Sequence, residues 1–366
     1  MVIEIVTKNL LSGGAERVIY NLVNYWSSKG IICKIILVDK REIFYKFSKN
    51  VEVIEIGKMS NNPIIDKFLR YKKVRDLTKS IGPDIVLSLP EEIGIYTIGA
   101  LLFSSFPVVV SERNDPWRMP YKKSTRLLRK LLYPFADGLI FQTKEASMFF
   151  SSRLREKGAV LKNPFDSSII NEIDNNNIDN NKDNIIIGAG RLEKQKNFAL
   201  LIEAFELFSR EYPDFKLHIY GNGSLKRDLE NLAKEKNIGD KVILPGSVKN
   251  LSKRIANARV FVLSSDYEGV PNVLIEAMAI GTPCIATNCS PGGAASLISN
   301  GENGFLIACG DKIAMYNKMK LIVDNECLSN DISRKSVLIK EELAVNKVGE
   351  EWLSYLKHII SRHNMK

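Results

Sequence analysis

Short apolar runs recur along the first half of the chain, and most are separated by stretches of helical periodicity. The run at 2–7 (VIEIVT) is typical of a buried strand, and the AERVIYNLVNYWSSKG that follows is typical of an amphipathic helix. Near-continuous apolar strands that alternate with helices indicate a parallel sheet covered on both faces. We therefore predict a doubly wound α/β domain over 1–170, with strands at 2–7, 34–39, 51–56, 84–89, 107–112, 138–143 and 159–164.

A polar interruption follows, and then the alternation resumes. Residues 171–184 are almost wholly Asn, Asp, Lys and Ile, which cannot cover a core, so we predict a linker there. A calcium loop is the poorer interpretation, because its glycine and spaced ligands are missing. Residues 185–345 predict a second Rossmann-like domain, and 346–366 a final helix. Ligand is expected in a cleft at the carboxyl ends of the strands. The second set of strands is predicted at 185–190, 216–221, 242–247, 259–265, 283–287 and 304–308.

The charge is distributed unevenly along these two halves. Residues 1–166 contain 27 Lys and Arg against 17 Asp and Glu, a surplus of 10, whereas residues 167–366 contain 25 of each. A basic first domain suggests an anionic partner such as lipid head groups, nucleic acid or polyphosphate, although a simply solvated surface is the plain alternative.

The cellular compartment is indicated by the absence of a membrane-spanning run and of a signal-peptide pattern in the sequence. No apolar run approaches the roughly 20 residues that span a bilayer, and the first residues do not have the pattern of a signal peptide. The five cysteines follow no ligand spacing and predict reduced thiols. We expect a cytoplasmic protein.

The segment 264–287 (SSDYEGVPNVLIEAMAIGTPCIAT) carries the strongest candidate chemistry. A strand ends, a loop presents Glu268 and Gly269, and a helix opens near Pro271, where free N–H groups and the helix dipole favour an anion. Glu276 lies further along this helix, where a carboxylate can accept both ribose hydroxyls. The Glu-x7-Glu spacing alone is uninformative, because Glu203/Glu211 and Glu342/Glu350 share it on ordinary helices.

Two further strand ends carry polar candidates. In GAGRLEKQKN (188–197), Arg191 and Lys196 can clamp a diphosphate and stabilise it as it leaves. A Gly-rich turn contains Gly221, and PGSV ends at Val248, where backbone groups can meet a base. In the first domain, a diglycine follows the opening strand without the spacing of a dinucleotide-binding motif. That diglycine is Gly13 and Gly14.

Together, GGAERV, GRLEKQKN, YGNG, PGSV and EGVPNVLIEAMAIGTPCIA resemble, in order and separation, the retaining glycosyltransferases of family 4 with the GT-B fold. The resemblance implies a nucleotide-sugar donor, with Arg191 and Lys196 on the diphosphate, Glu276 on the ribose and Glu268 on the sugar hydroxyls. It also implies a final helix that crosses back to the first domain. The donor-binding set it implies is completed by Gly13, Gly14, Gly221, Val248, Gly269, Val270, Pro271 and Asn272.

The chain departs from this family at two loops. Many relatives carry a histidine after the fifth strand of the first domain, where this chain has Arg113 within SERNDPW. Many also carry a glutamate in the later Gly-Gly loop, where this chain has Ala294, Ala295 and Ser296. The SERNDP segment itself resembles bacterial surface-polysaccharide (O-antigen, lipopolysaccharide or capsule) transferases. Candidate residues on the acceptor side are Glu112, Arg113 and Asn114.

These observations predict a retaining transfer of a hexose or N-acetylhexosamine from a UDP-sugar to a lipid-linked saccharide, a polyprenyl diphosphate being a fitting carrier. We expect no metal and no other cofactor, because no cluster of ligand residues is evident. The basic, apolar segments 67–80 and 121–135 predict contact with the anionic inner face of the cell membrane, and no nucleic-acid motif is present. The alternatives are a non-catalytic membrane- or nucleic-acid-binding protein, and an epimerase or phosphorylase of the same fold.

Overall fold

The computed structural model describes residues 1–11, 13–171 and 182–365 of the chain. It divides into two compact units, one of Met1–Pro164 with Leu343–Lys366 and one of Phe165–Glu342. The first unit therefore ends six residues before the predicted boundary at 170. The C-terminal segment, predicted as a final helix, is grouped with the first unit.

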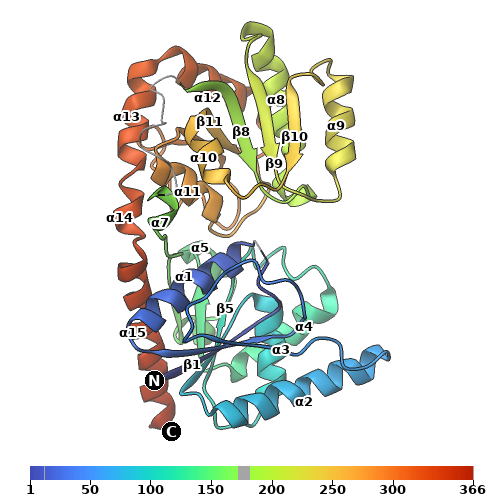
Figure 1. The fold of residues 1–366 in the computed structure, drawn as a ribbon, viewed down its shortest axis with the longest axis vertical. Helices are drawn as coiled ribbons and strands as arrows, with labels where there is room; N and C mark the ends of the chain where they lie inside the picture. The colour runs from blue at the N-terminus through green and yellow to red at the C-terminus, as the bar shows by residue number, and fades with distance from the viewer. Residues whose placement is uncertain (12, 172–181, 366) are drawn as a thin grey trace. The chain divides into compact units, whose positions relative to one another are not determined.

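The first unit is built on a seven-stranded sheet in the order β3-β2-β1-β4-β5-β6-β7 (Figure 1), and every strand pair in it is parallel. Parallel neighbours need crossover connections, and the intervening helices provide them. The strands are β1 (Val2–Thr7), β2 (Ile32–Leu37), β3 (Glu52–Glu55), β4 (Ile85–Ser88), β5 (Val108–Ser111), β6 (Gly138–Phe141) and β7 (Gly158–Val160).

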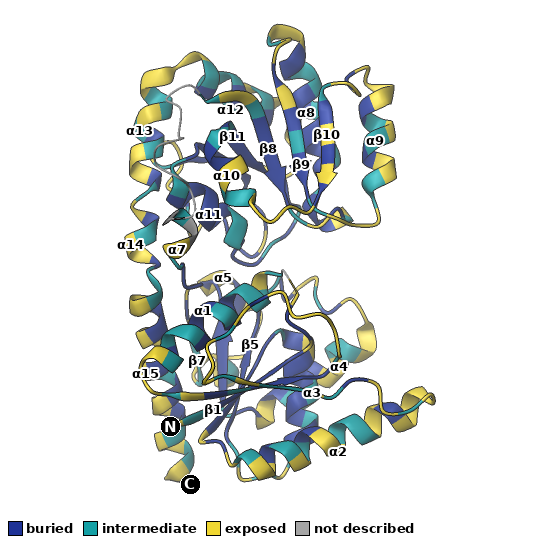
Figure 2. Cartoon of the chain, in the orientation of Figure 1, coloured by how far each residue is buried: buried dark blue, intermediate teal, exposed yellow. Residues whose placement is uncertain are grey.

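Alternate residues of these strands pack against different helices. Ile5 of β1 belongs to the core shared with α1 (Gly14–Ser28) and α15 (Val345–Asn364), whereas Val6 belongs to the core shared with α2 (Pro63–Ile81) and α3 (Glu91–Leu101). The sheet is thus buried on both faces, as its near-continuous apolar strands require (Figure 2). The remaining helices of this unit are α4 (Lys123–Leu132), η1 (Tyr133–Phe135), α5 (Lys144–Met148) and α6 (Ser152–Arg155).

The second unit repeats the design with a six-stranded parallel sheet, in the order β10-β9-β8-β11-β12-β13. Its strands are β8 (Asp183–Ala189), β9 (Lys216–Tyr220), β10 (Val242–Gly246), β11 (Ala258–Leu263), β12 (Cys284–Thr287) and β13 (Phe305–Ile307). Its helices are α7 (Ser168–Asn171), η3 (Lys194–Lys196), α8 (Phe198–Glu211), α9 (Lys226–Glu235), α10 (Leu251–Asn257), α11 (Asn272–Ile280), α12 (Lys312–Asp324), α13 (Glu326–Ser336) and α14 (Ile339–Glu342).

The predicted fold class is confirmed, since both units are parallel-sheet, Rossmann-like domains. All thirteen predicted strands are present, with ends shifted by a few residues. The linker prediction needs one correction: β8 already begins at Asp183, where polar residues start the strand, and Asp183 aligns with Ala258 of β11. Residues 172–181 of that predicted linker lie outside the described residues. Among the helices that the structure describes, none is long and apolar enough to cross a membrane.

Candidate functional site

The loops that follow four neighbouring strands of the second unit carry most of the predicted donor residues. Arg191 follows β8, Gly221 follows β9, Val248 follows β10 and Glu268 follows β11. Because these strands are parallel and adjacent in the order β10-β9-β8-β11, their carboxyl ends share one edge of the sheet. That edge is where ligands bind in open α/β sheets.

Two of these loops meet through an ion pair between Lys196 and Glu268. The lysine ammonium contacts Oε2 of the carboxylate, and the two side chains are only 10% and 16% exposed. Ser265 donates a further hydrogen bond to the same carboxylate oxygen at 3.3 Å. The cation predicted to bind diphosphate and the carboxylate predicted to bind sugar hydroxyls are therefore direct neighbours.

Hydrogen bonds between the same two loops fix this geometry. Gln195 donates from Nε2 to the carbonyl of Tyr267 at 3.0 Å and accepts from the backbone N–H of Asp266 at 2.9 Å. Asn197 donates to the carboxylate of Asp266 at 2.8 Å and caps α8 by accepting from the N–H of Leu200 at 3.2 Å. Sequence reasoning did not single out these supporting residues. Only Asn197, a capping residue before an apolar helix, carried a local signal.

A glycine after β9 allows another strand end to approach this loop. Gly221 has φ +136°, and a Cβ added there would lie 1.9 Å from the carbonyl oxygen of Gly190. Its N–H donates to the carbonyl of Gly246 at 3.0 Å, so the ends of three strands are joined. A side chain at Gly221 would force these strand ends apart.

The helix α11 starts beside Glu268 and carries the remaining donor candidates. Pro271 occupies its N-cap and Asn272 is its first residue, one position later than predicted for the proline. Val270, Pro271 and Glu276 are buried, and Glu276 is 8% exposed. The nine-residue helix directs its N-terminal N–H groups toward the loop that holds Glu268, which favours an anion at this position.

Gly269 is fixed by the loop that follows β12. A Cβ on Gly293 would lie 1.8 Å from the carbonyl oxygen of Gly269, and the N–H of Glu268 donates to the carbonyl of Ser290 at 3.0 Å. The later Gly-Gly loop, in which Ala294 is fully buried, thus supports the Glu268 loop directly.

Arg191 and Val248 are the exposed members of the predicted set. Arg191 makes a 3.4 Å contact from Nη2 to Oε1 of Gln195, which leaves its guanidinium largely accessible. Val248 is 38% exposed beyond the end of β10. An exposed apolar side chain at this edge can stack on a flat, apolar ring.

The first unit has its own polar edge at the carboxyl ends of its strands. Gly13 is the N-cap of α1 and Gly14 its first residue, and the carboxylate of Glu16 lies where a side chain on Gly13 would stand. Arg113, after β5, donates from Nη2 to Oδ1 of Asn163 at 2.6 Å, and its backbone N–H contacts Glu91 at 3.3 Å. Its Nε and Nη1 have no hydrogen-bond partner among the described residues. Burial lowers the pKa of the Arg113 side chain to about 10, against the opposing effect of Glu91.

Glu112 lies in the interior instead. Its carboxylate accepts a hydrogen bond from Tyr133 and lies 3.6 Å from Nη1 of Arg129, and it is 1% exposed. Burial, followed by the nearby Glu91 carboxylate, raises the pKa of Glu112 to about 8. In this position Glu112 ties the end of β5 to Arg129 of α4 and Tyr133 of η1.

Asn114, the third acceptor-side candidate, accepts a hydrogen bond from the N–H of Asp115 at 2.9 Å and shapes the loop locally. Within the described part of the chain, no three His, Cys, Asp or Glu side chains come together as metal ligands. The five cysteines are free thiols.

Comparison with known proteins identifies relatives over the whole length. The family model "Glycosyl transferases group 1" matches residues 169–337. A Campylobacter jejuni protein named N-acetylgalactosamine-N,N'-diacetylbacillosaminyl-diphospho-undecaprenol 4-alpha-N-acetylgalactosaminyltransferase is 31% identical over 364 residues, covering 95% of this chain and 97% of its own. A second C. jejuni protein, an alpha-1,4-N-acetyl-D-galactosaminyltransferase named for a GalNAc-alpha-(1->4)-GalNAc-alpha-(1->3)-diNAcBac-PP-undecaprenol substrate, is 28% identical over 98% of this chain and 99% of its own.

Solved structures share the architecture. Anabaena HepE, in complex with UDP and glucose, superimposes with a TM-score of 0.81 at 16% identity, covering 98% of this chain and 100% of its own. At this identity the likeness concerns the fold.

Proposed function

Because this chain belongs to the group 1 glycosyltransferases and has the GT-B fold, we propose that it transfers a hexose or N-acetylhexosamine from a UDP-sugar to a saccharide carried on a polyprenyl diphosphate. We place this transfer in the synthesis of a bacterial surface glycan such as O-antigen, lipopolysaccharide or capsule. The C. jejuni relatives, whose names specify undecaprenol-linked substrates, support this choice of acceptor.

One observation carries the proposal: Lys196 and Glu268 are held side by side by loops that hydrogen bonds lock together, at the start of α11. A donor needs cations for its diphosphate and a carboxylate for its sugar hydroxyls, within the length of one nucleotide sugar. Groups fixed before the ligand arrives lose little free energy to reorganisation, which is the condition for strong electrostatic stabilisation.

In the proposed reaction, the bond between the anomeric carbon and the diphosphate oxygen breaks first. Negative charge develops on the departing UDP, where Arg191, Lys196 and the N–H groups at the start of α11 stabilise it. Glu268 accepts hydrogen bonds from sugar hydroxyls and Glu276 from the ribose. The acceptor oxygen then bonds to the anomeric carbon on the face that UDP leaves, and its proton passes to a phosphate oxygen. This order of steps retains the anomeric configuration and needs no metal.

We assign the acceptor to the first unit. Arg113 supplies a cation there: its Nη2 donates to Asn163, and its buried Nε and Nη1 have no hydrogen-bond partner among the described residues. The surplus of 10 positive charges in residues 1–166 favours the anionic inner face of the cell membrane, with the basic, apolar segments 67–80 and 121–135 as the contacts.

The test is a donor screen that follows UDP release by the purified protein, with and without a polyprenyl-diphosphate-linked saccharide. We expect release with one UDP-sugar, dependent on the acceptor and unaffected by EDTA. Arg191→Ala and Glu276→Ala should each lower kcat/KM by about 10- to 100-fold, because each removes a charged contact to the donor. NMR of the product would report its anomeric configuration. The proposal is wrong if no nucleotide sugar binds or if the product is inverted.

A further inference from the structure

The first two turns of α2 extend beyond the core that holds the rest of the helix. Val74 and Thr78 are buried, but of residues 63–69 only Asp66 is buried. This end of the helix carries apolar side chains on its surface: Ile64 is 81% exposed and Phe68 is 68% exposed. At 1.5 Å per residue, the unpacked part projects about 10 Å (Figure 1).

The projecting end is nevertheless firmly built. Asn62 caps the helix by accepting from the N–H groups of Ile64 and Ile65 at 3.0 and 3.2 Å. Asp66 accepts from the N–H groups of Met59 and Ser60 at 2.7 and 3.1 Å, which fastens the preceding loop. The exposed apolar side chains are thus held in place by a polar framework, whereas a fraying end would leave them free to fold back.

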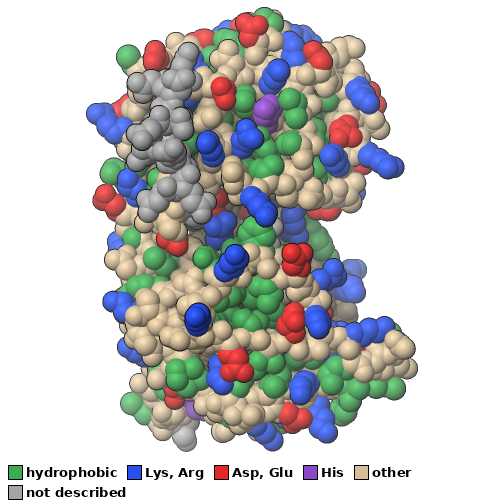
Figure 3. Space-filling view, in the orientation of Figure 1, with side chains coloured by type: hydrophobic (Ala, Val, Ile, Leu, Met, Phe, Trp, Pro, Cys, Tyr) green, Lys and Arg blue, Asp and Glu red, His purple; other side chains and the backbone are tan. Residues whose placement is uncertain are grey.

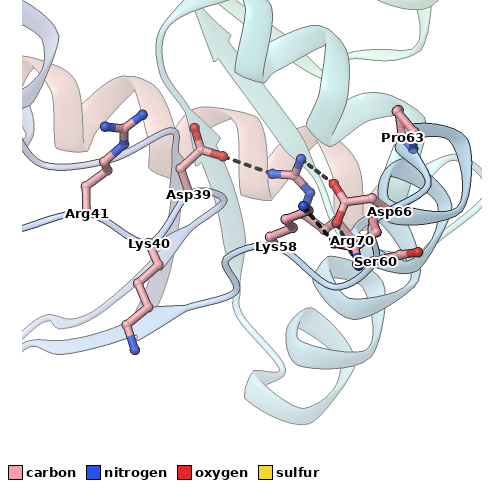
Figure 4. Close-up of a pocket in the computed structure, with 9 residues that line it drawn as sticks. Asp39, Lys40, Arg41, Lys58, Ser60, Pro63, Asp66 and Arg70 are labelled. Carbon is pink, nitrogen blue, oxygen red and sulfur yellow. Dashed lines mark hydrogen bonds and ion pairs between the residues drawn. The ribbon is translucent and has the colours of Figure 1, made fainter.

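A basic hollow of about 700 Å³ lies against this helix end (Figure 4). Arg70 pairs with both of its carboxylates, Asp39 at 2.9 Å and Asp66 at 2.6 Å, and the four cations of the lining exceed these two carboxylates by two charges. Lys40 and Arg41 form no ion pair with any described residue, and Lys58 contacts only the amide oxygen of Asn61, at 2.9 Å. The hollow is lined by Asp39, Lys40, Arg41, Lys58, Ser60, Asn61, Pro63, Asp66 and Arg70.

The cations and the apolar side chains occupy neighbouring positions on one surface. Lys58 precedes Met59, which is 41% exposed, and Pro63 of the hollow precedes Ile64 and Ile65. Lysine, arginine and hydrophobic side chains also gather over α2 in the space-filling view (Figure 3). Unpaired cations beside exposed apolar groups match the border of an anionic bilayer, where phosphates lie next to acyl chains.

We propose that this surface docks the protein on an anionic phospholipid bilayer. Lys40, Arg41 and Lys58 meet lipid phosphates, while Ile64 and Phe68 enter the acyl border. The inference rests on the proposed function, in which the acceptor is lipid-borne, and it adds which part of the first unit meets the lipid. It also places the contact at residues 40–41 and 58–68, which overlap the predicted segment 67–80 only at its start.

Vesicle flotation tests the charged half of the proposal. The triple variant Lys40→Gln/Arg41→Gln/Lys58→Gln should bind vesicles of phosphatidylglycerol and phosphatidylcholine roughly 100-fold more weakly, at about fivefold per cation. The control replaces three exposed lysines of the second unit and has the same net charge. That control is Lys234→Gln/Lys236→Gln/Lys253→Gln.

The apolar half is tested with the separate variant Ile64→Ser/Phe68→Ser. Its affinity for the same vesicles should fall roughly 100-fold, because two large side chains are no longer transferred from water to the bilayer. The matched control is Ile313→Ser/Leu338→Ser, whose side chains are 52% and 61% exposed on the second unit. Equal binding by either variant and its control would overturn the proposal, as would equal wild-type binding to neutral phosphatidylcholine vesicles.

Two further outcomes would replace the bilayer with another occupant. Release from vesicles by inorganic pyrophosphate, but not by sulfate at equal ionic strength, would indicate a site for a soluble diphosphate. A dimer that Ile64→Ser/Phe68→Ser dissociates would indicate a second copy of the chain. UDP titration separates this inference from the enzyme proposal. Protein that binds UDP but not vesicles refutes the docking surface alone, and protein that binds vesicles but no UDP refutes the proposed function alone.

Discussion

The ion pair between Lys196 and Glu268 predicts an unusual response to the substitution Glu268→Gln. In the free protein, the carboxylate neutralises the cation that is proposed to hold the diphosphate. Incoming UDP must share Lys196 with Glu268 and approach the negative charge of its carboxylate. Glutamine keeps the size and hydrogen-bonding capacity of the side chain but removes that charge. We therefore expect the variant to bind UDP more tightly while it transfers sugar more slowly.

The magnitude follows from the position of the pair. Two unit charges about 4 Å apart, as in a contacting ion pair, interact by about 4 kcal/mol at an effective dielectric constant of 20. The side chains are 10% and 16% exposed, so water reaches the pair and we discount this to about 1.4 kcal/mol, or roughly tenfold in the Kd for UDP. Loss of a charged hydrogen bond to the sugar should cost about 1.5–3 kcal/mol in the transition state, which lowers kcat about 10- to 100-fold.

Calorimetric titration with UDP and steady-state transfer with the UDP-sugar measure the two effects separately. Glu203→Gln is the control, because it removes a carboxylate on α8 from a surface ion pair with Lys312 of α12, 3.5 Å away. That control should leave both the Kd and kcat unchanged. Weaker or unchanged UDP binding by Glu268→Gln would refute the competition between carboxylate and diphosphate.

Two further substitutions test the fold beneath the site. Gly221→Ala should lower the free energy of unfolding by at least about 3 kcal/mol in urea titrations, because its Cβ would lie 1.9 Å from the carbonyl oxygen of Gly190. Gly310→Ala, at φ +78° but with open space around the added Cβ, should cost only about 1 kcal/mol, and equal losses in the two variants would contradict the steric argument. Burial raises the pKa of Glu4 to about 7, against a hydrogen bond from Thr78. Because this lies above the unfolded value of about 4.3, the wild type should lose about 3 kcal/mol of stability as the pH rises from 4 to 7. When the free energy of unfolding is measured from pH 4 to pH 7, Glu4→Gln should not show this decrease. If the wild type and Glu4→Gln lose stability in parallel, Glu4 is not its source.

The family decides between the functions that the sequence left open. Membership of the group 1 glycosyltransferases favours a transferase over a non-catalytic binding protein and over an epimerase or phosphorylase. The identity of the transferred sugar, UDP as the nucleotide of the donor and the lipid carrier of the acceptor stay proposals. The donor screen addresses them.

The sequence by itself determined the order of the secondary structure and the residue types at each strand end. Apolar runs such as 2–7 and 216–221 predicted strands, because burial on both faces of a parallel sheet requires apolar side chains at nearly every consecutive residue. The loop at 264–287 was predicted from its own residues, since a strand end, a glycine and a helix start are all local signals.

Only the tertiary structure decided which of these residues meet. Lys196 and Glu268 are 72 residues apart, and they pair because β8 and β11 are adjacent in the sheet. The sequence indicated Glu112 as an acceptor-side candidate, yet Arg129 and Tyr133 hold its carboxylate in the interior. Periodicity reports how deeply a residue is buried along its own element, whereas pairing depends on the order of strands and on packing between distant segments. For the same reason, the exposed start of α2 became visible only once the core had been assembled around its later turns.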